Sequence, residues 1–250
     1  MPFTIAHAIV APPLAKLTGG RLAVSALAVG AMAPDFEYLL FLETRRTVGH
    51  TPLGLLTFCL PASLCVLLLW HGLVKRPLAG LLPDRWAHVG AALSRPLPRS
   101  WQLVAATVAG VLLGAWTHIA WDSFTHVDGG MVQALPVLRR SVLGRANYLN
   151  LQYGGGVVGM ALLGVGIFVW ARRQPPVAVA QPPARRRIAC AVAIVGFTLV
   201  AALANVARAT LRYGLPNPKG LLVAAVLGMM AGAAVAVTAY GVTETARRPA

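Results

Sequence analysis

SWQLVAATVAGVLLGAWTHIAWDSFTH, residues 100–126, combines the two features that organise this sequence. Residues 100–121 contain no Asp, Glu, Lys or Arg. A run of this length can cross the hydrocarbon core of a membrane, which takes about 20 apolar residues. The block HIAWDSFTH, residues 118–126, then adds two histidines and an aspartate at the end of the run. The stretch therefore predicts a membrane helix that ends in a row of polar side chains.

Similar apolar runs recur along the chain. We predict six hydrophobic segments, at 22–42, 51–74, 100–121, 152–171, 188–207 and 220–243. None alternates polar and apolar residues with a period of two, as the strands of a membrane barrel do. Helices also satisfy their own backbone hydrogen bonds in lipid. The expected fold is therefore all-α, a polytopic helical membrane bundle of about six hydrophobic helices plus a short N-terminal helix at about 3–11 that stops at Pro12 and Pro13.

The composition excludes most other classes of protein. Hydrophobic residues make up 57% of the 250 residues and charged residues only 12%, about half the charged share of soluble domains. The formal charge of +15 comes from basic residues that fall almost entirely between the apolar runs. A nucleic-acid-binding protein would place them with aromatic residues on a soluble face, so no nucleic acid partner is expected. Their excess in alternate connections predicts that both termini lie in the cytoplasm.

Three regions follow from the spacing of the segments. Residues 1–171 are expected to form a helical membrane domain that contains the polar groups described below. Residues 172–187 are rich in Arg and Pro and predict an extended linker. Residues 188–250 are expected to form a C-terminal helical hairpin. The N-terminus lacks the basic start of a cleavable signal peptide, so the first segments are expected to stay in the mature protein.

The HIAWDSFTH block carries the clearest sign of chemistry. His118, Asp122 and His126 are four residues apart, and such positions drift by only about 40° per step around a helix. All three side chains therefore project from one helix face. Imidazole together with carboxylate suits Zn, Mn, Fe or Ni better than Ca. The row predicts a metal site, and the alternative is a helix end whose polar groups bind water and backbone.

Three other polar residues lie in or beside apolar segments. His7 is in the short N-terminal helix. Asp35 follows Pro34, which should break the segment 22–42 and leave the carboxylate in the first turn of the second piece. His50 precedes Thr51 and Pro52, a typical N-cap and first position of a helix. Ionisable groups are expensive inside a membrane and point to function, although each of these has a structural explanation of equal weight.

Several blocks together resemble a known family. MPFTIAH, MAPDFEYLL, GHTPLG, HIAWDSFTH and LQYGGG are similar to the blocks of an uncharacterised bacterial integral-membrane family, a domain of unknown function. That family is distantly similar to inner-membrane metal-dependent hydrolases, and these in turn resemble the zinc-dependent phospholipase C superfamily. The resemblance covers about residues 1–165.

The resemblance implies a metal site and a location. It implies a multi-pass protein of the bacterial inner (cytoplasmic) membrane that binds one or two divalent ions, with zinc or manganese preferred. The polar positions of the site would be His7, Asp35, His50, His118, Asp122 and His126. Within that set Asp35 and Asp122 would be the catalytic carboxylates. Asp35 would be a ligand or the general base, and His126 a ligand or a partner that holds a carboxylate in place.

The function implied by the resemblance is hydrolysis. The expected substrate is a phosphoester in a lipid or an envelope precursor. Two alternatives remain open at this point, namely a transporter of metal ions or protons and a membrane scaffold with a structural metal. Polar residues that line a path across the bilayer would favour the first, and a closed cage of ligands would favour the second.

Overall fold

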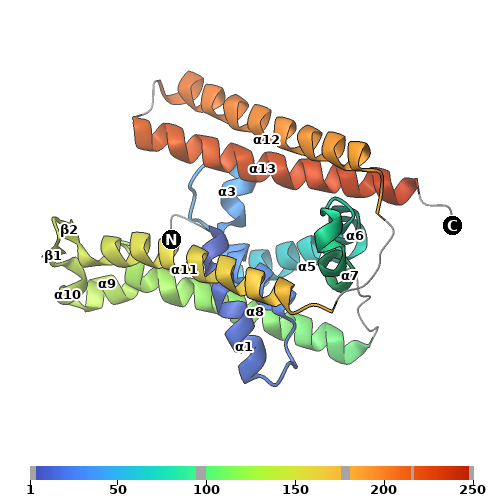
Figure 1. Ribbon diagram of the computed structural model, residues 1–250. Coiled ribbons are helices and arrows are strands. Elements are labelled where there is room, and N and C mark those ends of the chain that lie inside the picture. Colours follow the sequence, from blue (N-terminus) through green and yellow to red (C-terminus); the bar gives the residue numbers. More distant parts are fainter. Residues whose placement is uncertain (1–3, 94–99, 176–180, 215–216, 248–250) are drawn as a thin grey trace. The chain divides into compact units, whose positions relative to one another are not determined.

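The computed structural model describes residues 4–93, 100–175, 181–214 and 217–247. These residues are almost entirely helical, as predicted (Figure 1). Within the described residues, six helices are long and apolar enough to cross a membrane: Val24–Phe41, Pro52–Ala79, Trp101–Ala134, Asn147–Arg172, Ala184–Tyr213 and Pro218–Ala246. Each coincides with one of the predicted segments, and the chain is a multi-pass membrane protein.

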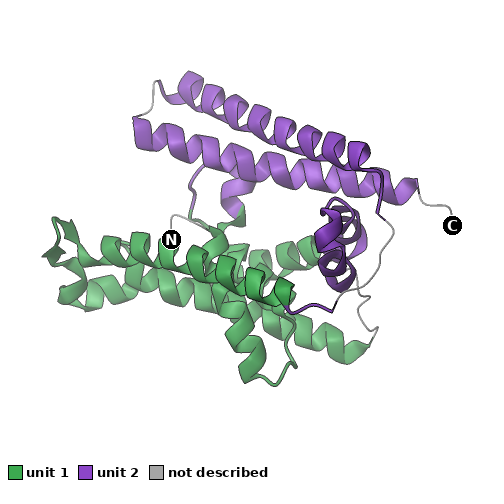
Figure 2. Cartoon of the chain, viewed as in Figure 1, with its two compact units in different colours: residues 1–36, 46–67, 98–172 green, residues 37–45, 68–97, 173–250 purple. Residues whose placement is uncertain are grey.

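The chain forms two compact units that interleave along the sequence (Figure 2). Unit 1 contains residues 1–36, 46–67 and 98–172, and unit 2 contains residues 37–45, 68–97 and 173–250. The predicted division of the chain into 1–171, 172–187 and 188–250 concerns which parts of the sequence fold independently. That division stays a prediction. Residues 176–180 of the predicted linker lie outside the described residues, and its last residues are already helical because helix α12 begins at Ala184.

Unit 1 is built around two helices in close contact, α2 (Val24–Met32) and α8 (Trp101–Thr125). Glycines allow this approach: a Cβ atom at Gly30 would overlap the Val111 backbone, and one at Gly114 would overlap the Leu27 carbonyl oxygen. The remaining elements of this unit are η1 (Thr4–Val10), α1 (Ala11–Leu17), η2 (Ala33–Asp35), α4 (Pro52–Gly54), η3 (Leu55–Cys59), most of α5 (Leu60–Leu69), α9 (Gly130–Ala134), α10 (Pro136–Arg139), β1 (Ser141–Val142), β2 (Arg145–Ala146) and α11 (Asn147–Arg172). β1 and β2 pair as a short antiparallel ribbon.

Pro34 affects its helix differently from Pro12 and Pro13. Pro34 interrupts its segment as predicted, because α2 ends at Met32 and the single 3₁₀ turn η2 holds Pro34 and Asp35. Helix α3 (Phe36–Phe41) follows. The prediction that the N-terminal helix stops at Pro12 and Pro13 is wrong. The chain changes there from the 3₁₀ turns of η1 to the α-helix α1, whose first turn accommodates both prolines because no hydrogen bond is required from their nitrogens.

The start of the second hydrophobic segment is capped as predicted. Thr51 adopts an extended backbone, and its hydroxyl accepts a hydrogen bond of 2.9 Å from the Gly54 amide. Pro52 occupies the first helical position. The cap ends the loop at a defined residue, so that His50 is held just outside the helix.

Unit 2 centres on a helical hairpin, α12 (Ala184–Tyr213) and α13 (Pro218–Ala246), which lie side by side (Figure 1). Gly228 again allows close approach, since a Cβ there would lie 2.6 Å from the Ala201 carbonyl oxygen. The hairpin packs with η4 (Trp70–Val74) and α6 (Lys75–Ala79). The shorter helices η5 (Asp84–Trp86) and α7 (Ala87–Leu93) complete this unit.

Candidate metal centre

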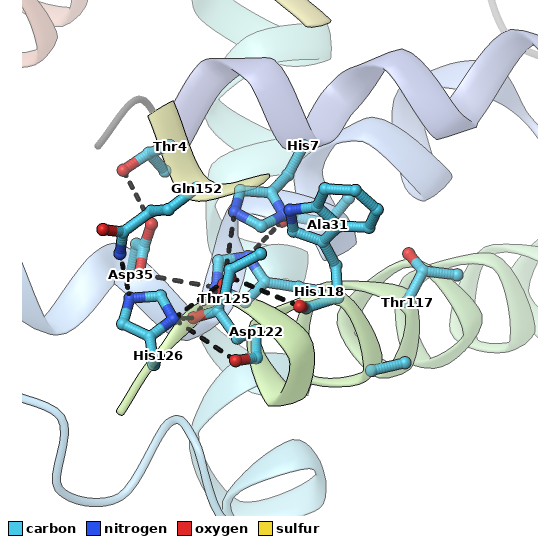
Figure 3. A network of polar contacts seen from close by, with 12 residues as sticks. Thr4, His7, Ala31, Asp35, Thr117, His118, Asp122, Thr125, His126 and Gln152 are labelled. Carbon is cyan, nitrogen blue, oxygen red and sulfur yellow. Dashed lines mark hydrogen bonds and ion pairs between the residues drawn. The ribbon is translucent and has the colours of Figure 1, made fainter. Parts of the chain in front are cut away.

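Four segments of unit 1 bring their polar side chains to one place (Figure 3). η1 contributes His7, η2 contributes Asp35 and α8 contributes His118 and Asp122. His50 comes from the loop before α4. Residues more than a hundred positions apart in the sequence thus meet in a buried cluster.

The α8 row has the geometry that its spacing predicts. His118 Nε2 lies 3.4 Å from Asp122 Oδ2, and His126 Nδ1 lies 3.4 Å from the same oxygen. α8 continues beyond the predicted segment to Thr125, with His126 as its C-cap. The helix therefore keeps its register through the whole row.

Asp35 and His50 complete the cluster around His118. Asp35 Oδ1 lies 3.5 Å from His118 Nε2 and 3.4 Å from His50 Nε2. His50 Nε2 also lies 3.6 Å from Asp122 Oδ2. His118 and His50 thus both stand between the two carboxylates.

His7 covers the other side of His118. The two imidazole rings are stacked with centroids 3.7 Å apart, and His7 Nε2 lies 3.8 Å from Asp122 Oδ1. Burial holds the pKa of His7 well below its ordinary value. A neutral imidazole keeps a nitrogen lone pair, which is what a metal ligand needs.

The spacing of these groups fits a metal ion. Their N···O distances of 3.4 to 3.8 Å exceed the usual 2.7–3.2 Å of N–H···O hydrogen bonds. They approach the separation of about 3.4 Å between ligands that each lie about 2.1 Å from a tetrahedral zinc ion. Two sets have mutually close ligand atoms: His7, Asp35 and His118, and His50, His118 and Asp122.

Two buried nitrogens lack the partner that burial normally demands. Within the described residues, His7 Nε2 and His118 Nε2 make no hydrogen bond. Such atoms are rare in folded proteins and call for an explanation. Both face the carboxylates of the cluster, so an ion bound there would satisfy them. The buried His and Asp groups are therefore positioned to hold a metal.

Neighbouring groups fix the orientation of the cluster. His118 Nδ1 donates a hydrogen bond of 2.7 Å to the Ala31 carbonyl, which leaves Nε2 as the nitrogen with a lone pair. The Thr4 hydroxyl donates to Asp35 Oδ2 at 2.8 Å, so that Oδ1 faces the two histidines. Partners of this kind orient ligands in known metal sites.

His126 lies at the margin of the cluster. Its Nε2 is 2.9 Å from Gln152 Nε2 on α11, and 19% of its side chain is exposed. It belongs to neither set of converging ligand atoms. Its contacts favour the second of its two expected roles, in which it holds Asp122 in place.

Arg46 is a residue of the site that sequence reasoning missed. Its Nη2 lies 3.1 Å from Asp122 Oδ2, and its Nη1 lies 3.6 Å from the exposed Asp128. Among the described residues, the buried Nε of Arg46 has no hydrogen-bond partner. In the sequence Arg46 looks like one more basic residue of a loop. The one feature of the sequence that linked Arg46 to the site is its position four residues before His50.

All six predicted residues lie in this one region of unit 1. Five of them contribute atoms to the converging sets, and His126 contacts Asp122 from outside. That they bind a metal and catalyse a reaction remains a prediction.

The comparisons with known proteins identify a family and no activity. The sequence model of a family described as "Domain of unknown function (DUF4184)" matches residues 1–242. Searches of the curated proteins and of the solved structures found no match.

Proposed function

Because the chain belongs to the DUF4184 family, whose description assigns no activity, we propose a function from the site itself: a membrane-embedded, metal-dependent hydrolase of phosphoesters. One observation carries the proposal. Imidazole nitrogens and carboxylate oxygens converge in a buried cluster at the spacing of metal ligands rather than of hydrogen bonds. His7, Asp35, His50, His118 and Asp122 would hold one or two divalent ions, zinc or manganese.

The bound ion would supply a Lewis acid for the phosphoryl oxygen and make water acidic enough to attack near neutral pH. The protein's own residues do the remaining work. Asp35, oriented by Thr4, would either hold the ion or accept a proton from water. His118 and His50 keep the two carboxylates apart.

Arg46 would bind the anionic substrate. A guanidinium donates to phosphate oxygens in a planar, often bidentate arrangement. Arg46 has donors beyond those that face Asp122, and 24% of its side chain is exposed. A phosphate group bound in the cluster would accept hydrogen bonds from the guanidinium nitrogens that make none within the described residues.

The charge of the site also favours an anion. The buried carboxylates of Asp35 and Asp122 and the guanidinium of Arg46 leave one negative charge in excess when the imidazoles are neutral. One divalent ion reverses this to one positive charge. In a poorly solvated site such a charge attracts an anionic phosphoester strongly.

The geometry gives less support to the two alternatives. A transport path needs polar groups along the depth of the bilayer, whereas the six residues gather at one place. A structural metal site is closed, whereas Arg46 and His126 are both partly exposed beside the cluster. Hydrolysis therefore remains the function that the site supports best.

The test combines metal analysis with a phosphoester assay. Purified protein should contain zinc or manganese and hydrolyse a generic phosphomonoester or phosphodiester. Asp122→Asn should lose most of the metal and lower kcat/KM by at least about 100-fold, since a direct ligand matters more than the supporting partners whose loss costs about 10–100-fold. Asp84→Asn, the same change at an exposed carboxylate of unit 2, should alter neither. Equal metal content and activity in Asp122→Asn would reject the proposal.

A further inference from the structure

An apolar cavity of about 520 Å³ lies beside the cluster in unit 1. Its walls come from η1, α8 and α11, and they include Trp116, Ala120, Phe124, Val158 and Leu162. A volume of this size is typical of small-molecule sites. Apolar walls give no hydrogen bonds to water or to a polar ligand, so a hydrocarbon is the chemistry that matches them.

The cavity adjoins the metal centre at His7, which lines the cavity and also belongs to the cluster. His7 Nε2 faces Asp122 Oδ1, whereas Arg46 Nη2 faces Asp122 Oδ2. The Asp122 carboxylate thus stands between a hydrocarbon-lined space and a cationic side chain. An amphiphile is the kind of molecule that has one part for each.

The walls also indicate where the ligand comes from. α8 and α11 are both long and apolar enough to cross a membrane, and the exposed residues beside the cavity on α11 are apolar. A chain already dissolved in the bilayer can enter between such helices without crossing water. The lining includes small residues, Ala120 on α8 and Gly155 and Gly159 on α11.

We propose that this cavity holds the hydrocarbon chain of an anionic amphiphile whose phosphate group reaches the cluster beside Arg46. The position of the phosphate group at the cluster rests on the proposed function. The binding site for the hydrocarbon chain in the cavity goes beyond that function. The proposal commits to a single-chain phosphate ester as the simplest ligand with both parts.

Adjacent valines on α11 supply a matched pair of variants. Val158 lines the cavity and Val157 does not, although their exposed fractions are similar at 56% and 62%. Val158→Phe should fill part of the cavity, whereas Val157→Phe places the same bulk elsewhere on the helix. α11 carries none of the converging ligand atoms, so neither change removes one.

The probe is a hexadecyl phosphate with bromine atoms on its chain, added to detergent-solubilised protein. Bromine quenches tryptophan fluorescence on contact, and Trp116 and Trp121 line the cavity. We expect saturable quenching in the natural sequence and in Val157→Phe. In Val158→Phe the probe should bind at least about tenfold more weakly, since each methylene excluded from an apolar site costs about fourfold. Butyl phosphate, which has the same charged group, should not displace the probe's chain at equal concentration.

The outcomes separate this proposal from the proposed function. Saturable quenching that is weakened in Val158→Phe and not in Val157→Phe supports the binding site for the hydrocarbon chain. If this result is obtained and no phosphoester is hydrolysed, only the proposed function fails. The same quenching should persist in Asp122→Asn. Quenching that rises without saturation, or is equal in all variants, would mean random contact of detergent-dissolved chains with exposed tryptophans and would overturn the proposal. If Val158→Phe does not fold, Ala120→Phe on the opposite wall replaces it with the same expected result.

Discussion

Two groups of charged residues in this protein are built in opposite ways. In unit 2, Glu43 Oε1 accepts hydrogen bonds from Tyr213, Arg212 and Arg208 at 2.9, 3.0 and 3.2 Å. Arg208 also donates to the Leu42 carbonyl at 2.8 Å. In the unit 1 cluster the imidazole nitrogens and carboxylate oxygens stop 3.4 to 3.8 Å apart. The first group is closed by its own hydrogen bonds, and the second is held open.

The difference separates structural from functional polar groups in a membrane protein. A polar network that serves stability gains by satisfying every donor and acceptor. The Glu43 network does this around Leu42, whose positive φ of 54° turns the chain and presents the carbonyl to Arg208. A site that awaits a ligand must leave atoms unsatisfied, as His7 Nε2 and His118 Nε2 are within the described residues. Long N···O distances and buried nitrogens without a hydrogen bond, rather than charge alone, distinguish the candidate site from the Glu43 network.

Substitution of Arg46, compared with the same substitution of its neighbour Arg45, is expected to give the largest effect in a test of this contrast. Arg46 faces the open cluster, whereas Arg45 pairs with Glu43 and stacks on Phe41 in unit 2. We expect Arg46→Met to lower kcat/KM for a phosphoester by about 100-fold, the loss typical of one transition-state donor, with bound metal retained. Arg45→Met should leave kcat/KM close to that of the natural sequence.

Recovery in the conservative variant sharpens this result. Arg46→Lys keeps the charge and loses the planar fork, so it should recover only part of the activity. Loss of metal in Arg46→Met, measured by elemental analysis, would show instead that Arg46 holds the cluster together.

Thr4 should give a smaller effect on the metal alone. Thr4→Val removes the hydroxyl that donates to Asp35 Oδ2 at nearly constant volume. Loss of such a partner costs about tenfold or more in metal affinity, which competition with a chelator can measure. Thr18→Val removes a hydroxyl that bonds only to the Leu14 and Ala15 carbonyls at the end of α1, and it should leave the affinity unchanged. Equal affinities in both variants would contradict the role assigned to Thr4.

Much of the fold follows from the sequence because local rules decide it. The absence of charge along residues 100–121 fixes a membrane helix, and the spacing of His118 and Asp122 fixes a common face. Pro34 breaks its helix and Thr51 caps the next one for reasons that involve only a few neighbouring residues. The prolines at 12 and 13 show the limit of such rules, since a proline ends one helical turn and begins another equally well.

The details of the site depend on contacts that no local pattern records. His7 meets His118 because η1 packs on α2 and α11, and α2 approaches α8 at Gly30 and Gly114. The roles of Thr4 and Arg46 depend on the direction in which each side chain points after that packing. Sequence reasoning could therefore name the candidate ligands, and His126 as an alternative supporting partner, but neither Thr4 nor Arg46.

The Glu43 network gives the smallest effect and completes the contrast. Hydrogen bonds from Tyr213 and then Arg208 hold the pKa of Glu43 below its ordinary value of 4.5. A depressed carboxyl pKa contributes stability above the unfolded-state pKa, and that contribution is lost as the pH falls through the folded-state pKa. Glu43→Gln should therefore lower the Tm slightly at pH 7, and the difference should shrink as the pH falls below about 4.5.

Thermal unfolding measured across this pH range, with metal content followed in parallel, tests whether the Glu43 network and the unit 1 cluster are independent. Glu43→Gln should change Tm without releasing metal, whereas Asp122→Asn should release metal at pH 7. Release of metal by Glu43→Gln would mean that the closed network and the open cluster act as one.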